Sequence, residues 1–316
     1  MTLSGQALTI LLYGRTGAGK TTQIGVLAED LFKRTKKKTR LYTVDGGGSL
    51  SIQPYVNLGI IELVPLGATD VWLFADRASK GMIRDPQDLT GNKWIQLLPA
   101  DIGLVAYESA HQMAKLMQQD MERLAGIGRT IGGDANTSFD VGPDAGKPAN
   151  TSGEDKIRVG STKGYQKFAI PQDRILFHMM ESAKLPVDIV LWSAGVNKDD
   201  DDITSSQRNI GPQVIGNALT NYLPAIFNYT LRIDVVPAKT GQAEKHLLYL
   251  GTHTDSNAGN ATALGNLRRP LDAPLTSAQT ILDPANLAAA LKILRDDAVA
   301  TSEKAIAKRL GLSQAV

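Results

Sequence analysis

The stretch ALTILLYGRTGAGKTT (7–22) decides the fold of this chain. Residues 7–13 form an apolar run, which is typical of a strand that is buried on both faces of a sheet. A glycine-rich turn follows, and a helical pattern begins at Lys20. Residues 14–21 match the spacing G-x-x-x-x-G-K-[ST] without deviation. A strand, a glycine-rich turn and a helix in this order predict a loop whose backbone N–H groups cradle phosphates.

This phosphate-binding loop (P-loop) predicts a site for ATP together with Mg²⁺. Lys20 would reach the β- and γ-phosphates as a positive point charge, and the Thr21 hydroxyl would be a ligand of the magnesium ion. A glycine-rich turn that arises by chance is the alternative, but the strand before it and the helix after it both fit the motif. The residues expected around the phosphates are Gly14, Arg15, Thr16, Gly17, Ala18, Gly19, Lys20, Thr21 and Thr22.

Composition excludes several other classes of protein. The chain has 316 residues, and 34 Lys and Arg against 32 Asp and Glu leave a net charge of +2, which is no global signature of nucleic-acid binding. The absence of cysteine excludes disulfides and thiolate metal sites, and the 4 histidines show no spacing typical of zinc ligands. The basic run KRTKKKTR (33–40) is expected to be a solvated helix end.

We expect a cytoplasmic protein, located in the host cytoplasm if a phage encodes it. The first residues, MTLSGQALTI, lack the basic and apolar regions of a signal peptide. No stretch approaches the roughly 18 consecutive apolar residues that a membrane-spanning helix needs. The sequence therefore predicts no membrane partner.

The rest of the chain alternates between apolar runs and helical patterns, which predicts an α/β fold with a mostly parallel sheet covered by helices on both faces. Strands are expected at 41–44, 60–66, 102–107 and 187–194, and an antiparallel pair at the sheet edge at 231–236 and 246–252. Helices are expected at 20–33, 109–124, 171–184 and 214–227, with helical pieces around Trp72 and Trp94. Residues 1–255 would form the core, with a long polar loop at 126–163, and residues 256–316 a C-terminal extension with short helices.

Acidic and polar side chains lie at the ends of several expected strands, where a parallel sheet binds its ligands. Glu108 is the better candidate for the Walker B acid, which organises the magnesium ion, and the alternative is that it only caps the next helix. Asp45 would position a water molecule or the metal, unless it is only a turn former before three glycines. Ser193 and Asn197, which end and follow a later strand, would sense the γ-phosphate.

The order of these features resembles the RecA core: a P-loop, a strand that ends in an acid, a strand that ends in acid-Ser, and a strand that ends in polar residues. LYTVDGGGSLSIQPYVNLGI (41–60) is similar to the part of RecA in which Asp-x-Glu closes a strand and an aromatic-bearing helix follows. ADIGLVAYESA (100–110) resembles its Walker B segment, and IGNALTNYLPAIFNYTLRID (215–234) resembles the helix and strand after its second DNA loop. The resemblance covers roughly residues 7–255, and it is closest to the shortened RecA-core ATPases of tailed phages, some of them associated with single-strand annealing.

The chain also departs from the RecA pattern. Position by position, the catalytic glutamate of RecA falls on Gly47, which has no side chain, and the Walker B acid Glu108 is one methylene longer than the usual Asp. The resemblance therefore implies slow hydrolysis of ATP, or hydrolysis completed by a neighbouring subunit. Arg268 and Arg269 resemble basic residues that reach across a RecA-type interface to a neighbour's γ-phosphate, and the alternative is an ordinary surface pair. The expected catalytic residues of the chain itself are Lys20, Glu108 and Asp45.

Two loops would correspond to the DNA-binding loops of RecA, residues 126–163 and 197–213. The first contains Arg129, Arg158 and Lys163, which would meet the phosphates of single-stranded DNA. The second contains a run of four acidic residues, which would repel them. Solvated loops without a ligand are the alternative for both segments.

Two further interpretations compete with a recombination or annealing ATPase. D-x-x-G at Asp45 and N-K-x-D at Asn197 would suit a GTPase, but Asp45 follows Lys20 too closely to leave room for a switch region, and N-K-x-D arises easily within an acidic run. Among ATP-binding proteins, the alternative is a phage DNA-packaging or virion-assembly ATPase with weak hydrolysis. The expected partners are the nucleotide, single-stranded DNA and further copies of the same chain.

Overall fold

The structure is a computed structural model. It describes residues 7–44, 47–66, 75, 77–84, 87, 93–96, 100–119, 138–140, 156–158, 164–196, 209–214, 222–236, 243–255, 261–263, 266–267, 275–276 and 279–310.

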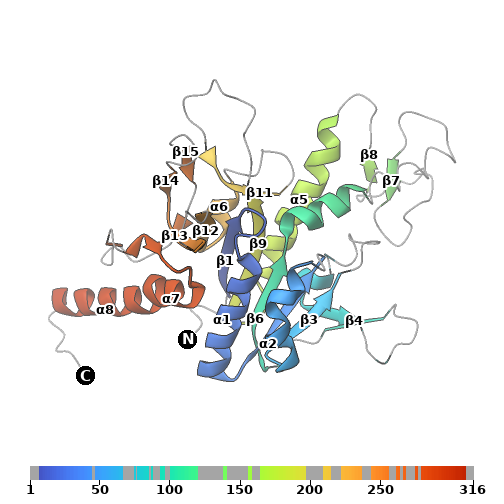
Figure 1. The fold of residues 1–316 in the computed structure, drawn as a ribbon. Coiled ribbons are helices and arrows are strands. Elements are labelled where there is room, and N and C mark those ends of the chain that lie inside the picture. Colours follow the sequence, from blue (N-terminus) through green and yellow to red (C-terminus); the bar gives the residue numbers. More distant parts are fainter. Residues whose placement is uncertain are drawn as a thin grey trace.

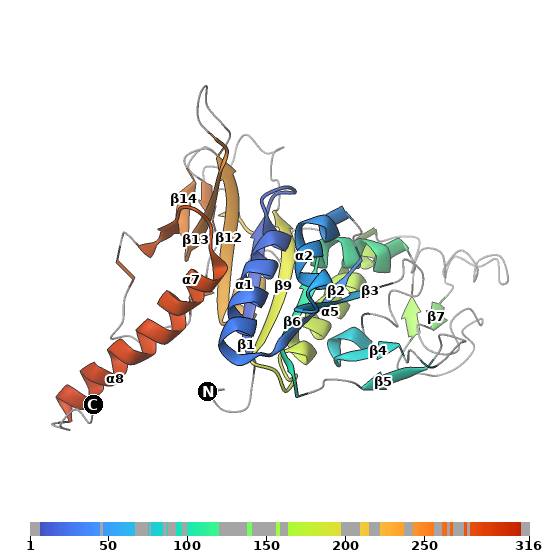
Figure 2. The same ribbon diagram turned by 60° about the horizontal axis from the view of Figure 1, so that its bottom comes forward.

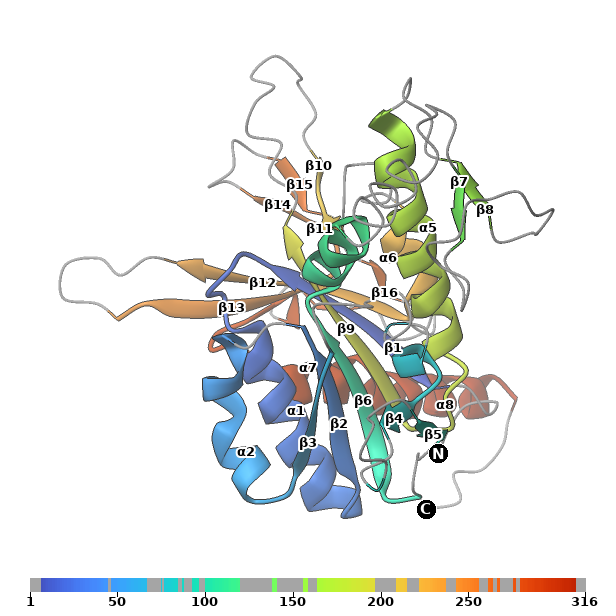
Figure 3. The same ribbon diagram turned by 90° about the vertical axis from the view of Figure 1, so that its right-hand side faces the viewer.

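A mixed sheet of 10 strands forms the centre of the described part of the chain. Its strands are β1 (Leu8–Gly14), β2 (Lys38–Thr43), β3 (Ile61–Pro65), β6 (Ile102–Glu108), β9 (Ile189–Val196), β11 (Pro212–Gln213), β12 (Tyr229–Val236), β13 (Lys245–Leu250), β16 (Asn266–Leu267) and β17 (Ile281–Leu282). The main path runs β17-β13-β12-β1-β9-β6-β2-β3, with β11 beside β9 and β16 beside β12 (Figure 3). All neighbours from β12 to β3 along this path pair in parallel, and β13 returns antiparallel to β12.

Helices cover both faces of this sheet. They are α1 (Lys20–Thr35), a 3₁₀ turn η2 (Gly47–Ile52), α2 (Gln53–Asn57), α5 (Gly164–Ser182), α6 (Leu223–Ile226), α7 (Leu287–Leu291), a π-helical turn η5 (Lys292–Asp296) and α8 (Asp297–Arg309), and residues 110–119 are also helical. Figure 1 shows α1 and α2 on one face and α5 with α6 on the other. The expected α/β class, with a mostly parallel sheet, two helical layers and an antiparallel pair toward one edge, is confirmed.

Within the described ranges, three small sheets lie outside the main one. They consist of β4 (Met82–Arg84) with β5 (Trp94–Gln96), β7 (Ser138–Asp140) with β8 (Lys156–Arg158), and β10 (Asn209–Ile210) with β15 (Ala261–Ala263) and β14 (His253–Asp255).

Alternate residues of the buried strands divide the core into two layers. On β1, Leu11 and Tyr13 belong to the cluster on the side of α5 and α6. Ile10 and Leu12 belong to the cluster on the side of α1 and α7. Because successive side chains of a strand point to opposite faces, an apolar run such as 10–13 is what a sheet covered on both sides requires.

The C-terminal segment packs on the α1 side of the sheet and joins its core. Leu287, Ala290, Leu291 and Leu294 are buried in the same cluster as the apolar side of α1. Figure 2 shows α7 and α8 as one continuous helical segment that leads away from the sheet, and η5 joins the two. The boundary expected at residue 255 stays a prediction, but part of the segment beyond it belongs to the central core.

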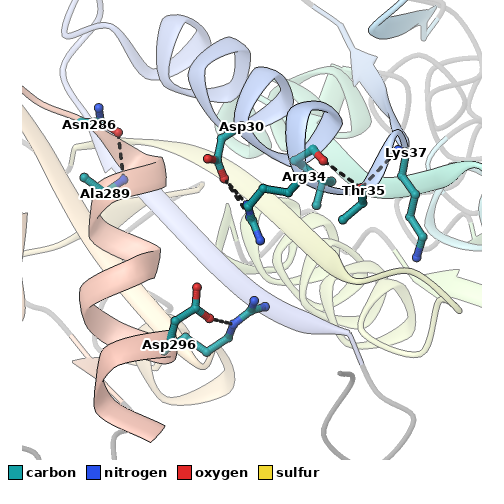
Figure 4. Close-up of polar contacts among 9 residues, drawn as sticks. Asp30, Arg34, Thr35, Lys37, Asn286, Ala289 and Asp296 are labelled. Carbon is teal, nitrogen blue, oxygen red and sulfur yellow. Dashed lines mark hydrogen bonds and ion pairs between the residues drawn. The ribbon is translucent and has the colours of Figure 1, made fainter. Parts of the chain in front are cut away.

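The basic run 33–40 is largely neutralised by neighbouring acids. Figure 4 shows Arg34 against Asp30, one turn earlier on α1, with the nitrogen and oxygen atoms of the ion pair 2.7 Å apart. The other pairs are Lys33 with Glu29, Lys37 with Asp188, Lys38 with Asp101 and Arg40 with Glu62. Lys33 and Arg34 lie at the end of α1 that is remote from the P-loop, as expected of a solvated helix end. Lys38 and Arg40 lie on β2 instead, and Arg40 is 1% exposed, so for these two residues the expectation was wrong.

Some local expectations were wrong. Trp94 begins the strand β5 rather than lying in a helical piece, and Trp72 lies outside the described residues. Helix α5 begins at Gly164 and thus earlier than residue 171. The segment 126–163 contains the antiparallel pair β7 and β8. None of the helices in the described ranges is long and apolar enough to cross a membrane.

Candidate functional site

The P-loop connects β1 to α1, and its backbone requires glycine for two different reasons. Gly17 and Gly19 have φ angles of 81° and 93°, in the left-handed region that side chains disfavour. At Gly14, a Cβ atom would lie 2.3 Å from the carbonyl oxygen of Ile233 on β12, so the parallel strands can approach because no side chain is present. The glycines of the motif therefore set both the turn and its position against the sheet.

Lys20 begins α1 and folds back over the P-loop. Its Nζ donates to the carbonyl oxygens of Gly14 and Arg15, both at 2.9 Å. Burial lowers the pKa of the Lys20 ammonium from its ordinary value, and the negative charge of Glu108 offsets part of this effect. The Lys20 ammonium is partly desolvated and is held by neutral carbonyl groups. Anionic phosphate groups beside it would therefore stabilise its charged form.

Thr21 and Glu108 meet across the carboxyl ends of the strands. The Thr21 hydroxyl donates a short hydrogen bond to the Glu108 carboxylate, which is 7% exposed at the end of β6. A hydroxyl and a carboxylate are oxygen ligands of the kind that Mg²⁺ takes together with water and nucleotide phosphates. The pair therefore fits a magnesium ion beside the P-loop, with Thr21 and Glu108 as the protein groups that would hold it or its water ligands.

The turn after Glu108 is fixed by two serines. Ser109 has a φ angle of 65°, which is uncommon for a residue other than glycine, and its N–H donates to the Ser193 hydroxyl at 2.8 Å. The Ser109 hydroxyl also accepts from the N–H of Gln112, so Ser109 supplies a cap for the helical residues 110–119. Ser193 itself is fully buried on β9. Its hydroxyl thus helps to set the backbone from which Glu108 reaches Thr21, and the role as γ-phosphate sensor stays a prediction.

Two residues that lie beside the P-loop were not predicted from the sequence. The ring of His246 on β13 lies with Nδ1 3.0 Å from the carbonyl oxygen of Ala18. Gln23, in the first turns of α1, donates to the carbonyl oxygen of Ala285 at 3.0 Å and accepts from the N–H of Leu287 at 2.8 Å. No motif marks either residue, because their partners lie more than two hundred positions away in the chain.

Several predicted site residues lie outside the described part of the chain. They are Asp45, Asn197, Arg129, Lys163, Arg268 and Arg269. Arg158 is the last residue of β8, and Gly47 begins the 3₁₀ turn after β2. The structure therefore brings together the P-loop, Thr21, Glu108 and Ser193, and the roles expected for the other residues stay predictions.

Comparison with known proteins gives a faint likeness in structure. No protein-family model and no curated protein sequence matches the chain. A KaiC-like protein of the hyperthermophilic archaeon Pyrococcus horikoshii superposes with a TM-score of 0.38 at 10% identity, over 78% of each chain. The RadB recombinase superposes with a TM-score of 0.38 at 14% identity, over 78% of this chain and 81% of its own. At this level the likeness carries no conclusion about function, which rests on the residues of the chain itself.

Proposed function

We propose that this chain binds Mg-ATP at the P-loop and hydrolyses it slowly, as a P-loop ATPase with a RecA-type core. The contact between Thr21 and Glu108 is the observation that carries the proposal. It brings the expected magnesium ligand of the loop to the expected Walker B acid, although the two residues are 87 positions apart in the sequence. A glycine-rich turn without a ligand gives no reason for this pairing.

The residues of the site have separate roles in this proposal. The N–H groups of the P-loop hold the phosphates, and Lys20 exchanges its bonds to the Gly14 and Arg15 carbonyl oxygens for the β- and γ-phosphates. A bound magnesium ion neutralises charge that develops on the transferred phosphoryl group, and Thr21 and Glu108 would hold it. Glu108 or Asp45 positions the attacking water, because Gly47 has no side chain for that task.

Gly47 stands where RecA has its catalytic glutamate, and this difference favours a site shared between copies of the chain. Arg268 and Arg269 are the residues that we assign to a neighbour's γ-phosphate. A positive charge supplied in this way raises the rate of phosphoryl transfer by several orders of magnitude in related chemistry. Turnover per subunit should therefore rise with protein concentration.

Recombination or annealing of DNA is the process that we assign to this ATPase, in a phage-type protein. Arg129, Arg158 and Lys163 would contact the phosphates of a single strand, and each phosphate contact contributes roughly −0.7 to the log–log slope of affinity against salt. The alternative is a DNA-packaging or virion-assembly ATPase, for which single-stranded DNA would change neither binding nor turnover.

Single-turnover hydrolysis of radiolabelled ATP, at several protein concentrations and with or without a single-stranded oligonucleotide, separates these outcomes. The proposal predicts weak basal turnover that rises with concentration and with the oligonucleotide. Fast turnover that is independent of concentration would contradict the shared site, and an absent response to DNA would favour the assembly role. A clear preference for GTP over ATP would replace the ATPase by the GTPase alternative.

A further inference from the structure

A hollow lies directly beside the P-loop, on the side that faces the C-terminal segment. Its volume is about 340 Å³. Its lining residues are Ala18, Gly19, Thr22, Gln23, Glu244, Lys245, His246, Asp283, Pro284 and Ala285. A volume of this size lies within the roughly 300–1,000 Å³ typical of pockets for small molecules.

One wall of the hollow is the phosphate-binding loop itself. Ala18, Gly19 and Thr22 line it, and they belong to the stretch that is expected to hold the phosphates. A triphosphate seated on the P-loop must carry its nucleoside to one side of the loop. The hollow begins where the loop ends, so it offers space to the nucleoside without any movement of the phosphates.

The opposite wall is supplied by the C-terminal segment and is held in place by several bonds. Gln23 is 5% exposed and is bonded to both Ala285 and Leu287, so the first turns of α1 clasp the chain just before α7. The Ala285 N–H donates to the His246 carbonyl oxygen at 2.7 Å. These bonds fix the width of the hollow before any ligand arrives, which lowers the cost of binding.

Polar side chains stand at the rim of the hollow. His246 contacts the Ala18 carbonyl oxygen through Nδ1, and since that oxygen can only accept, Nδ1 carries the proton of this hydrogen bond. The other ring nitrogen of His246 lies 3.5 Å from a carboxylate oxygen of Glu244. Glu244 therefore presents a carboxylate beside the P-loop, and carboxylates accept hydrogen bonds from ribose hydroxyls and from the amino groups of bases.

We propose that this hollow binds the nucleoside part of the nucleotide, so that residues 283–285 of the C-terminal segment form a wall of the nucleotide site, with Glu244 as the acceptor for nucleoside hydroxyl or amino groups. The inference rests on the proposed binding of a nucleoside triphosphate at the P-loop. It adds that the chain distinguishes a nucleotide from a bare polyphosphate, and that the distinction depends on Ala285 and Glu244, far from the motif.

The test compares Mg-ATP with Mg-tripolyphosphate, which has the phosphate chain without a nucleoside, by isothermal titration calorimetry. In the full-length chain we expect ATP to bind more tightly by about tenfold or more. Ala285→Phe should fill the hollow and reduce the affinity for ATP by about tenfold while the affinity for tripolyphosphate stays unchanged. Ala300→Phe, at an exposed position of α8 outside the hollow, is the matched control and should change neither affinity.

A second pair of variants tests the polar rim without adding bulk. Glu244→Gln should weaken ATP by a few-fold and leave tripolyphosphate unchanged, whereas Glu303→Gln, at an exposed position of α8, should leave both unchanged. Equal affinity of the wild type for the two ligands, or ATP binding that Ala285→Phe leaves intact, would overturn the inference while the P-loop proposal stands. Failure of the folded wild type to bind either ligand would overturn the proposed function itself.

Discussion

The clasp between α1 and the C-terminal segment gives a prediction whose size follows from the structure. Gln23 makes two hydrogen bonds, one to the carbonyl oxygen of Ala285 at 3.0 Å and one from the N–H of Leu287 at 2.8 Å. Gln23→Met keeps nearly the same volume but removes both bonds. Since Gln23 is 5% exposed and Leu287 is fully buried, water cannot readily replace the partner that the Leu287 N–H loses.

A buried backbone group left without its partner costs about 1–3 kcal/mol, and the Ala285 carbonyl oxygen is only partly buried, so the loss of both bonds in Gln23→Met should lower the free energy of unfolding by about 2–5 kcal/mol. That is a large fraction of the roughly 5–15 kcal/mol that stabilises a typical domain. The matched control is Gln53→Met on α2, where the amide contacts Asn57 in an exposed place. We expect this control to change the stability by no more than about 0.5 kcal/mol.

Urea unfolding followed by far-UV circular dichroism measures both variants. The midpoint should fall for Gln23→Met with little change in the slope of free energy against urea concentration, and limited proteolysis within residues 279–310 should become faster. If Gln23→Met is as stable as Gln53→Met, the bonds to Ala285 and Leu287 do not hold the C-terminal segment. The claim that this wall of the hollow is preformed would then be wrong.

Three further predictions concern the P-loop and its acid. Because burial lowers the folded pKa of Lys20 below its ordinary value, charged Lys20 costs stability in the free protein at low pH, and this cost is relieved as pH rises from the lowered pKa to the ordinary one. Phosphates favour the charged form, so calorimetry between about pH 7 and 10 should show ATP affinity falling as pH rises, more steeply than in Lys20→Ala. Glu108→Gln keeps the acceptor for Thr21 but loses the charge, so single-turnover assays should show bound ATP hydrolysed about 100-fold more slowly, and unchanged turnover would exclude Glu108 from the chemistry. Gly14→Ala would place a Cβ 2.3 Å from the Ile233 carbonyl oxygen and should cost about 1–3 kcal/mol in urea unfolding, whereas Gly195→Ala, with its nearest contact at 3.5 Å, should be tolerated; equal stability of the two variants would contradict the close approach of β1 and β12.

The features that the sequence predicted correctly are those encoded by neighbouring residues. The apolar run before Gly14 and the spacing from Gly14 to Thr21 identify β1, the P-loop and the start of α1, because strand burial, left-handed glycines and helix initiation are local preferences. The apolar run that ends at Glu108 predicted β6 in the same way. Glu108 was expected at the magnesium site from its place at a strand end, and the structure adds its contact with Thr21.

The features that the sequence did not reveal depend on partners far apart in the chain. In the sequence, Gln23 is an ordinary polar residue of a helix. Its role depends on the segment around Ala285, which only the folded chain brings beside it. His246 is an isolated histidine in a strand until the topology places β13 near the P-loop. Trp94 and Ile95 are residue types enriched in strands, but so short a segment is a strand only through its pairing with β4. Tertiary contacts override local preferences in such places.

The central claim is that the P-loop holds the phosphates of Mg-ATP through Lys20. Thermal unfolding of the wild type and of Lys20→Ala, each with and without Mg-ATP, tests it most directly. At a hundredfold excess of ATP over its Kd, the wild type should gain about 2.7 kcal/mol of stability, and Lys20→Ala should lose most of that gain while the free proteins remain folded. Equal stabilisation of the two proteins by Mg-ATP, or no stabilisation of the wild type, would contradict the assignment of the nucleotide to this loop.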